Sequence, residues 1–176
     1  MTHLPSFLRL DIRTFARALW VLAVLVLALV LTAVAFAQTT LPVAVGQALP
    51  ELKVKDQHDK PWSVVPSTRL VLFAAGRKAS NLVQGVLQAL PKDQLTRRQA
   101  VYLADMSKMP GFITRTIALP ALKEMPYAIG VSLDEATLAS WPRQPDAVTL
   151  VELENGVVKS ISYTTVEAEL RAALAL

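Results

Sequence analysis

The chain has 176 residues with 18 basic and 14 acidic side chains, two histidines and no cysteine. The absence of cysteine excludes disulfides, thiolate nucleophiles, iron–sulfur clusters and thiolate metal sites, and two histidines are too few for a histidine-rich metal site. No cluster of basic residues is interleaved with aromatic ones, so we expect no nucleic-acid partner.

The N-terminal region carries the marks of an export signal. Residues 18–37 read ALWVLAVLVLALVLTAVAFA, contain no charged side chain and follow a stretch with three arginines. The AFA sequence at 35–37 fits the A-x-A rule of signal peptidase and predicts a cleaved signal peptide. The 20 apolar residues also match the roughly 30 Å hydrocarbon core of a bilayer and predict an uncleaved, helical membrane anchor. Both alternatives stay open for residues 1–37.

Either alternative exports the rest of the chain. The arginines keep the N-terminus in the cytoplasm, so we expect residues 38–45 to be a linker and residues 46–176 to form one domain. That domain would be periplasmic, or anchored to the inner membrane and facing the periplasm. Without the segment before residue 18, the chain has 15 basic and 13 acidic residues, too small an excess to predict an anionic partner.

The first half of the domain predicts two strands in a hairpin, then a buried strand and a helix. Alternation around Leu52 and Val54 and a polar turn at 56–59 indicate the hairpin, which returns through Trp62. The apolar run at 69–75 is typical of a strand buried on both faces. Ser80 is a suitable cap for the following helix, whose apolar stripe continues to Leu90.

The middle of the domain predicts two more strands separated by a helix. Residues 100–104 form an apolar run that Asp105 closes, and 127–133 form another. Between them we expect a helix at 112–118 that Pro120 interrupts. A short helical turn is expected at 134–138.

The C-terminal part predicts a hairpin and a closing helix. Asn155-Gly156 lies between alternating apolar runs at 148–153 and 157–163, the strongest local hairpin signal. Thr164 or Thr165 would cap a helix that ends at Leu176, with one apolar face formed by Val166, Leu170, Ala173 and Leu174. Parallel βαβ units followed by this hairpin predict an α/β fold, a central mixed sheet with helices on both faces.

Three stretches of the domain carry a family resemblance. They are GQALPEL at 46–52 with Asp56 and DKP at 59–61, then LVLFAA at 70–75, and then the hairpin at 148–163. In this order they resemble the thioredoxin-like superfamily, in the branch that contains thiol peroxidases and the membrane-tethered thioredoxins of cytochrome maturation. The resemblance implies a thioredoxin-like central mixed β-sheet flanked by helices over most of residues 46–176, preceded by the N-terminal apolar helix.

The resemblance fails at the chemistry. Alignment on Phe73 places Lys78 and Asn81 where the redox family has its C-x-x-C cysteines. The family's cis-proline immediately precedes the closing hairpin, whereas Pro145 lies two or three residues too early. Thiol oxidoreductase or peroxidase activity is therefore excluded, because no residue can supply a thiolate.

Candidate site residues gather where the redox site would be. Arg77, Lys78, Ser80 and Asn81 lie at a predicted helix N-terminus, which favours a carboxylate or phosphate, although a solvated helix start explains them as well. Asp105 follows a buried strand, where α/β folds place ligands. It would be either a surface turn residue or an ion-pair partner of Lys78.

Other candidate sites have simpler explanations. Ser80 as a nucleophile would need a histidine base, and His58 lies in a distant polar turn. The turn at 56–59 lacks the ligands of a Ca²⁺ loop, and no G-x-G-x-x-G or Walker motif is present. We expect no cofactor and no metal.

The aromatic residues Trp62, Phe112, Tyr127 and Trp141 are expected to be core or half-buried anchors. The methionine-rich stretch 106–125 is either core or an apolar contact surface.

These observations predict a redox-inactive thioredoxin-like envelope protein that acts as a binding or scaffolding module. Its partner would be an envelope protein, contacted around 77–81, Asp105 and 106–125, and it would also meet the membrane through residues 18–37 if these are uncleaved. A non-thiol enzyme or a small-anion-binding protein that uses the same edge is the alternative.

Overall fold

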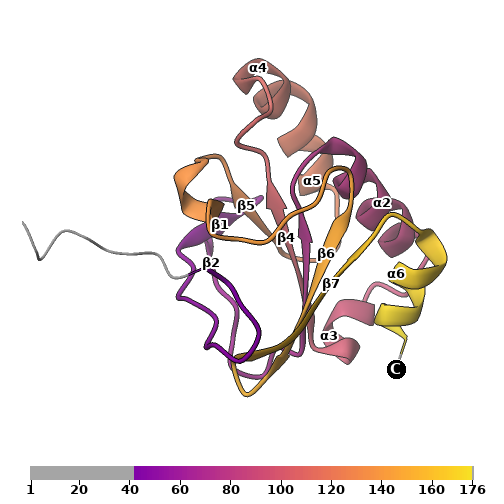
Figure 1. The fold of residues 1–176 in the computed structure, drawn as a ribbon. Helices are drawn as coiled ribbons and strands as arrows, with labels where there is room; N and C mark the ends of the chain where they lie inside the picture. Colours follow the sequence, from indigo (N-terminus) through magenta and orange to yellow (C-terminus); the bar gives the residue numbers. More distant parts are fainter. Residues whose placement is uncertain (1–41, 176) are drawn as a thin grey trace, which may run out of the picture. The chain divides into compact units, whose positions relative to one another are not determined.

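The sheet in this computed structural model, which describes residues 42–175, has seven strands in the order β2-β1-β5-β4-β3-β6-β7 (Figure 1). The strands are β1 Val54–Asp56, β2 Pro61–Trp62, β3 Leu70–Ala74, β4 Ala100–Asp105, β5 Ile129–Ser132, β6 Val148–Glu154 and β7 Val157–Thr164. The signal peptide or anchor predicted at 1–37 lies outside the described residues. Within residues 42–175, no helix is both long and apolar enough to cross a membrane.

The sheet is mixed, as the element order predicts. β3 pairs with β4 in parallel and β4 pairs with β5 in parallel, whereas β6 runs antiparallel to both β3 and β7. The short β1–β2 hairpin joins antiparallel at the β5 edge. The parallel strands β3, β4 and β5 therefore end at the same edge of the sheet, the place where α/β folds hold ligands.

The helices are α2 Arg77–Gln88, α3 Gln94–Arg98, α4 Gly111–Ile113, the π-helix η1 Thr114–Ala118, α5 Leu119–Lys123, the 3₁₀-helix η2 Ala136–Leu138 and α6 Glu167–Leu174. The α-helices α2, α3, α5 and α6 supply side chains to one core, which packs on the face of the sheet that carries Leu70, Leu72 and Tyr102. This face is the one that α2 and α6 cover in Figure 1.

The opposite face is covered with little helix. Val71 and Phe73 of β3 belong to a second core cluster, which also contains Val43, Leu52, Trp62, Trp141 and Leu138 of η2. Helices on both faces were expected, but η2 is the one helix in this second core among the described residues. Because β3 has both faces covered, all five of its residues are buried.

Two predicted helix starts are wrong. α2 begins at Arg77 after Gly76, whose φ of 133° only glycine adopts readily, so Ser80 lies inside the helix and does not cap it. The final helix begins at Glu167. Thr164 does order its start, because its hydroxyl accepts the Val166 N–H and donates to the Glu169 carboxylate. The predicted apolar face holds at Leu170 and Leu174, but Val166 is exposed.

Pro120 does not interrupt the helix of the middle region, which runs through α4, η1 and α5 from residue 111 to 123. Proline sits in the first turn of α5, where its missing N–H and fixed φ are tolerated. The wider π-helix immediately before it changes the hydrogen-bond pattern at that point. The short helix α3 was missed, because five residues are too few to show a periodic pattern.

Candidate functional site

The sequence-predicted residues Arg77, Lys78 and Asn81 are exposed at the N-terminus of α2, beside the end of β3. The Lys78 Nζ lies 2.7 Å from the Asp146 Oδ2, and the two side chains are 75% and 54% exposed. Asp146 has a φ of 63°, a left-handed conformation that aspartate tolerates better than most residues. We call Arg77, Lys78, Asn81 and Asp146 the edge site.

Asp146 belongs to the loop 139–147, called here the β6 loop, which leads into the closing hairpin. The family resemblance places a cis-proline at this point, but all peptide bonds in residues 42–175 are trans, including the one before Pro145. The Lys78–Asp146 pair thus joins the two segments that would carry the cysteines and the proline of a redox site. The contact is an exposed ion pair.

The sequence predicted that Asp105 is either a surface turn residue or the partner of Lys78, and both alternatives are wrong. Its side chain is 2% exposed and its Oδ2 lies 2.8 Å from the Arg143 Nη1. The other carboxylate oxygen, Oδ1, accepts hydrogen bonds from the backbone N–H and the hydroxyl of Ser107 at 2.9 and 2.6 Å. A buried carboxylate needs such partners, because an isolated charge in the interior is very costly.

The Arg143 guanidinium is partly exposed and has several partners in the protein. It donates to the Leu138 carbonyl as well as to Asp105, and its Cζ lies 5.4 Å from the centre of the Phe73 ring. Phe73 in turn packs against Trp141 with ring centroids 5.2 Å apart. The Thr149 hydroxyl adds a bond to the Pro142 carbonyl at 3.0 Å. These contacts fix the β6 loop to strands β3, β4 and β6.

The sequence pattern did not single out Arg143 or Asp146 as site residues. No local pattern marks Arg143, and its partner Asp105 is 38 residues away. Asp146 lies one or two residues before the position where the resemblance expects the proline, and its pairing with Lys78 spans 68 residues. Contacts at such separations depend on how the strands are ordered in the sheet.

Ser80 is turned toward the interior and not toward the edge site. It lies with Gln84 near the phenol of Tyr102, a fully buried residue of β4 whose hydroxyl makes no hydrogen bond of good geometry. Burial raises the pKa of Tyr102, and the nearby Ser80 and Gln84 side chains oppose this only in part.

The turn at 56–59 is a simple hydrogen-bonded turn. One oxygen of the Asp56 carboxylate accepts the N–H groups of His58 and Lys60 at 2.8 and 2.9 Å. Desolvation is the largest single influence and raises the Asp56 pKa, but the two backbone bonds and the nearby charges of His58 and Lys60 together outweigh it, so this pKa is lowered. No cluster of three metal-ligating side chains occurs in residues 42–175.

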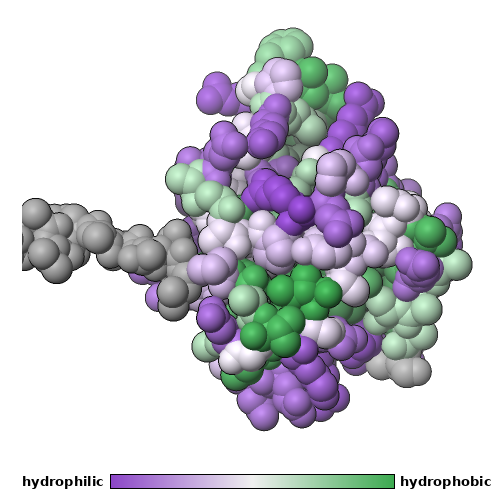
Figure 2. Space-filling view, in the orientation of Figure 1, coloured by the Kyte–Doolittle hydropathy of each residue, from purple (hydrophilic) through white to green (hydrophobic). Residues whose placement is uncertain are grey.

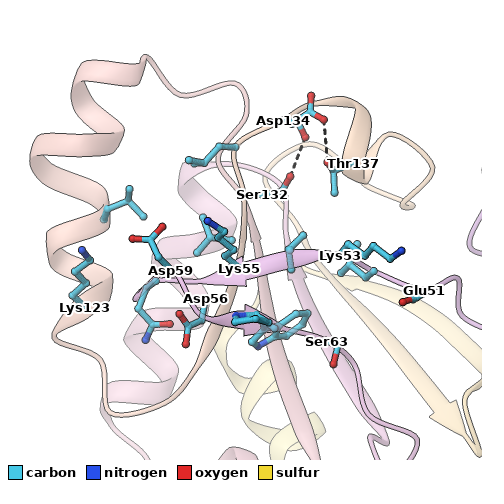
Figure 3. Close-up of a pocket in the computed structure, with 18 residues that line it drawn as sticks. Glu51, Lys53, Lys55, Asp56, Asp59, Ser63, Lys123, Ser132, Asp134 and Thr137 are labelled. Carbon is cyan, nitrogen blue, oxygen red and sulfur yellow. Dashed lines mark hydrogen bonds between the residues drawn. The ribbon is translucent and has the colours of Figure 1, made fainter.

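An open groove of about 640 Å³ lies between the β1–β2 hairpin, α5 and the segment after β5 (Figure 3). Trp62 packs on Gly130 of β5 beside it, where an added Cβ would lie 2.6 Å from the indole. Charged side chains of both signs line the groove, including Lys55, Lys123 and Asp59. In Figure 3 the Ser132 hydroxyl donates to the backbone carbonyl of Asp134, and the Thr137 hydroxyl donates to the Asp134 carboxylate. The groove holds no convergent catalytic group.

The expected anchors and contact surface divide unevenly. Trp62 and Trp141 are buried and Tyr127 is half-buried, as expected, but Phe112 is 76% exposed. In the stretch 106–125, Met106 and Leu122 are core residues, whereas Ile113 and Ile117 are exposed. Burial raises the pKa of Tyr127 to about 12, with a smaller contribution from Tyr102.

Several solved structures of similar fold are named for thiol proteins. A candidate protein disulfide isomerase from Bacteroides thetaiotaomicron matches 77% of this chain and 90% of its own, at 12% identity and a TM-score of 0.51. The thioredoxin domain of a thiol-disulfide oxidoreductase from Bacteroides vulgatus matches 75% of this chain and 99% of its own, at 10% identity and a TM-score of 0.50. A peroxiredoxin-like protein from Aquifex aeolicus covers 76% and 86%, at 9% identity and a TM-score of 0.50. No protein-family model and no curated protein matches the chain.

At these identities the likeness establishes the fold alone. The protein has a thioredoxin-like fold, and the sequence prediction of that fold is confirmed. The chain contains no cysteine, so the thiol chemistry for which these neighbours are named has no nucleophile here.

Proposed function

We propose that this thioredoxin-like domain is a redox-inactive binding module of the cell envelope that holds a protein partner through the edge site. Arg77, Lys78 and Asn81 present two cations and one amide at the start of α2, and Asp146 adds one acid. All four side chains are exposed. A mixed set of exposed polar groups suits recognition, because electrostatic complementarity selects a partner and orients it.

The observation that carries the proposal is the Asp105–Arg143 pair, in which Asp105 is buried and Arg143 is partly exposed. Buried ion pairs are weak sources of stability, since desolvation offsets much of their attraction, and some are retained because they specify one conformation. Here the pair fixes the β6 loop, which presents Asp146 to Lys78. A surface held rigidly before binding loses less conformational entropy when the partner docks.

An enzyme that uses Lys78 is the less favoured function. Lysines that act as nucleophiles or bases are usually desolvated or placed beside another cation that activates them. The Lys78 side chain is 75% exposed and already paired with a carboxylate. That carboxylate also competes with any small anion for the start of α2, which weakens the anion-binding alternative.

Site-specific photo-crosslinking in cells that make the full-length protein tests the proposal. The crosslinker is placed at Asn81 in the edge site and, as a control, at exposed Arg97 of α3. α3 lies before β4, at the opposite end of the strands. We expect one reproducible protein adduct at position 81 that is absent at position 97.

A matched pair of triple variants then separates the edge site from general surface charge. R77A/K78A/N81A removes two cations and one amide from the edge site, and Q88A/K92A/R97A removes the same groups elsewhere; all six positions are exposed. Because the first variant changes position 81, the crosslinker is moved in both variants to position 146, the remaining residue of the edge site. The adduct should disappear in the first variant and persist in the second. Persistence in both variants, or no adduct at position 81, would refute the proposal.

A further inference from the structure

The helical segment that follows β4 exposes more large apolar side chains than its own packing requires. We call residues 108–118 the tip, which contains α4 and η1. Phe112, Ile113 and Ile117 of the tip are 76%, 40% and 61% exposed. α4 stands at the top of Figure 1, and the surface there is largely hydrophobic in Figure 2. Contiguous exposed apolar side chains of this kind mark interaction surfaces.

The polar groups of the tip are turned back onto its own backbone. The Thr116 hydroxyl donates to the Phe112 carbonyl at 2.7 Å, and the Thr114 hydroxyl to the Pro110 carbonyl at 3.3 Å. These are bonds from a hydroxyl to the carbonyl four residues earlier. They leave the tip with few hydroxyl groups that need water, so it can enter a poorly hydrated environment at little cost.

The charges of this region all have one sign. Residues 106–123 contain Lys108, Arg115 and Lys123 and no acidic residue. The Lys108 Nζ lies 3.5 Å from the Glu135 Oε1, but these side chains are 73% and 69% exposed. Such an exposed ion pair is weak. Apolar side chains framed by cations are the pattern of segments that lie in the interface of an anionic bilayer.

The chain enters the domain beside the β6 loop. The Val43 N–H donates to the Ser140 carbonyl in the β6 loop at 3.2 Å. Only residues 38–42 separate Val43 from the apolar run that ends at Ala37. Even fully extended, this connection spans only about 20 Å. A chain anchored by that run therefore keeps the β6 loop close to a membrane surface.

We propose that the tip is a membrane-contact surface, with Phe112, Ile113 and Ile117 inserted in the interface of an anionic bilayer and Arg115 and Lys108 at its headgroups. Insertion needs no change in the core, because the three apolar side chains are already exposed. The contact is separate from the edge site and would hold a tethered domain in one orientation on the bilayer. A convex helical tip suits a fluid bilayer, which adapts to its shape.

The test uses full-length protein in nanodiscs that contain phosphatidylglycerol. Because the chain has no cysteine, Thr116→Cys gives a single labelling site for an environment-sensitive dye while all three apolar side chains stay in place. Thr96→Cys on α3 is the matched control, since both threonines are exposed. We expect a blue-shifted emission and quenching by headgroup-proximal spin-labelled lipid at position 116, and neither at position 96.

Two further variants keep the proposal falsifiable. Phe112→Ser with Ile117→Ser should abolish the quenching at position 116 at unchanged thermal stability, because both side chains are exposed. Arg115→Glu, or replacement of phosphatidylglycerol by phosphatidylcholine, should reduce it severalfold, whereas R77A/K78A/N81A should leave it intact. The proposal is overturned if the dye at position 116 stays in water in anionic discs. It is also overturned if shielding occurs only when other envelope proteins are added, which would make the tip a protein-binding surface.

Discussion

Two ion pairs of nearly equal length lie at one edge of the sheet, and burial makes them different. Asp105–Arg143 and Lys78–Asp146 are separated by 2.8 and 2.7 Å. The Asp105 side chain is 2% exposed and that of Lys78 is 75% exposed. Charges in water are screened, whereas a buried charge that loses its partner keeps its desolvation cost. Distance alone therefore cannot rank them: the first pair holds the loop, and the second is available to a partner.

The largest effect is expected from Arg143→Met, which leaves Asp105 buried with only Ser107 as a partner. Removal of one member of a buried pair destabilises by several kcal/mol, and we expect about 3 kcal/mol because Arg143 is partly exposed. Urea unfolding measures this loss. Arg97→Met, at an exposed position of α3, is the control and should change stability little. Equal small effects at both positions would show that the Asp105–Arg143 pair does not hold the loop.

Asp105→Asn sharpens the comparison, because it removes the charge and keeps the shape. The amide can still accept from Ser107, and Arg143 keeps the Leu138 carbonyl and the Phe73 ring. We expect a loss of about 1–2 kcal/mol in the free energy of unfolding. If Asp105→Asn costs as much as Arg143→Met, the lost attraction between the two charges accounts for the effect, and not the desolvation cost of an unpaired Asp105.

Tyr102→Phe tests burial without a partner. The Tyr102 hydroxyl is fully buried and lacks a hydrogen bond among the described residues. Removal of an unsatisfied buried group relieves its desolvation cost, so the variant should be equal to or up to about 1 kcal/mol more stable than the parent. Thermal unfolding at neutral pH measures the change. A destabilisation above that size would mean that Ser80 or Gln84 does bond the phenol in solution.

Tyr127 predicts a loss of stability at alkaline pH. Its pKa is about 12 in the folded protein and about 10 in the unfolded chain. Above pH 10 the unfolded state loses this proton first, so the free energy of unfolding falls as pH rises toward 12. Urea unfolding from pH 9 to 12 should show a shallower decline for Tyr127→Phe. Tyr127 is half-buried. An identical decline in both proteins would show that other groups cause the loss of stability.

The smallest effect is expected at the exposed pair. Lys78→Ala should change stability by no more than about 0.5 kcal/mol, because solvent screens its attraction to Asp146. A double-mutant cycle with Asp146→Asn, which tolerates the left-handed backbone of that position, isolates the coupling energy. A coupling above about 1 kcal/mol would place Lys78 among the structural residues and weaken its assignment to the edge site.

The sequence determined the order and type of most elements. Leu70–Ala74 and the Asn155-Gly156 hairpin carry signals within a few residues, because a doubly buried strand must be apolar and a tight turn needs residues that tolerate positive φ. The same local reasoning failed at Pro120, where a preceding π-helix made proline acceptable. The absence of a thiol also followed from the sequence alone, since composition leaves no nucleophile for redox chemistry.

Only the tertiary structure decided which charges meet and which side chains face water. The partner of Asp105 proved to be Arg143, because strand order and the path of the β6 loop bring together residues 38 positions apart. Phe112 and Leu122 are both apolar residues of one helical stretch, yet one is exposed and the other is core. Hydrophobicity determines which environment a side chain prefers. The packing of α5 against the sheet and the projection of α4 beyond it determine whether that side chain is buried or exposed.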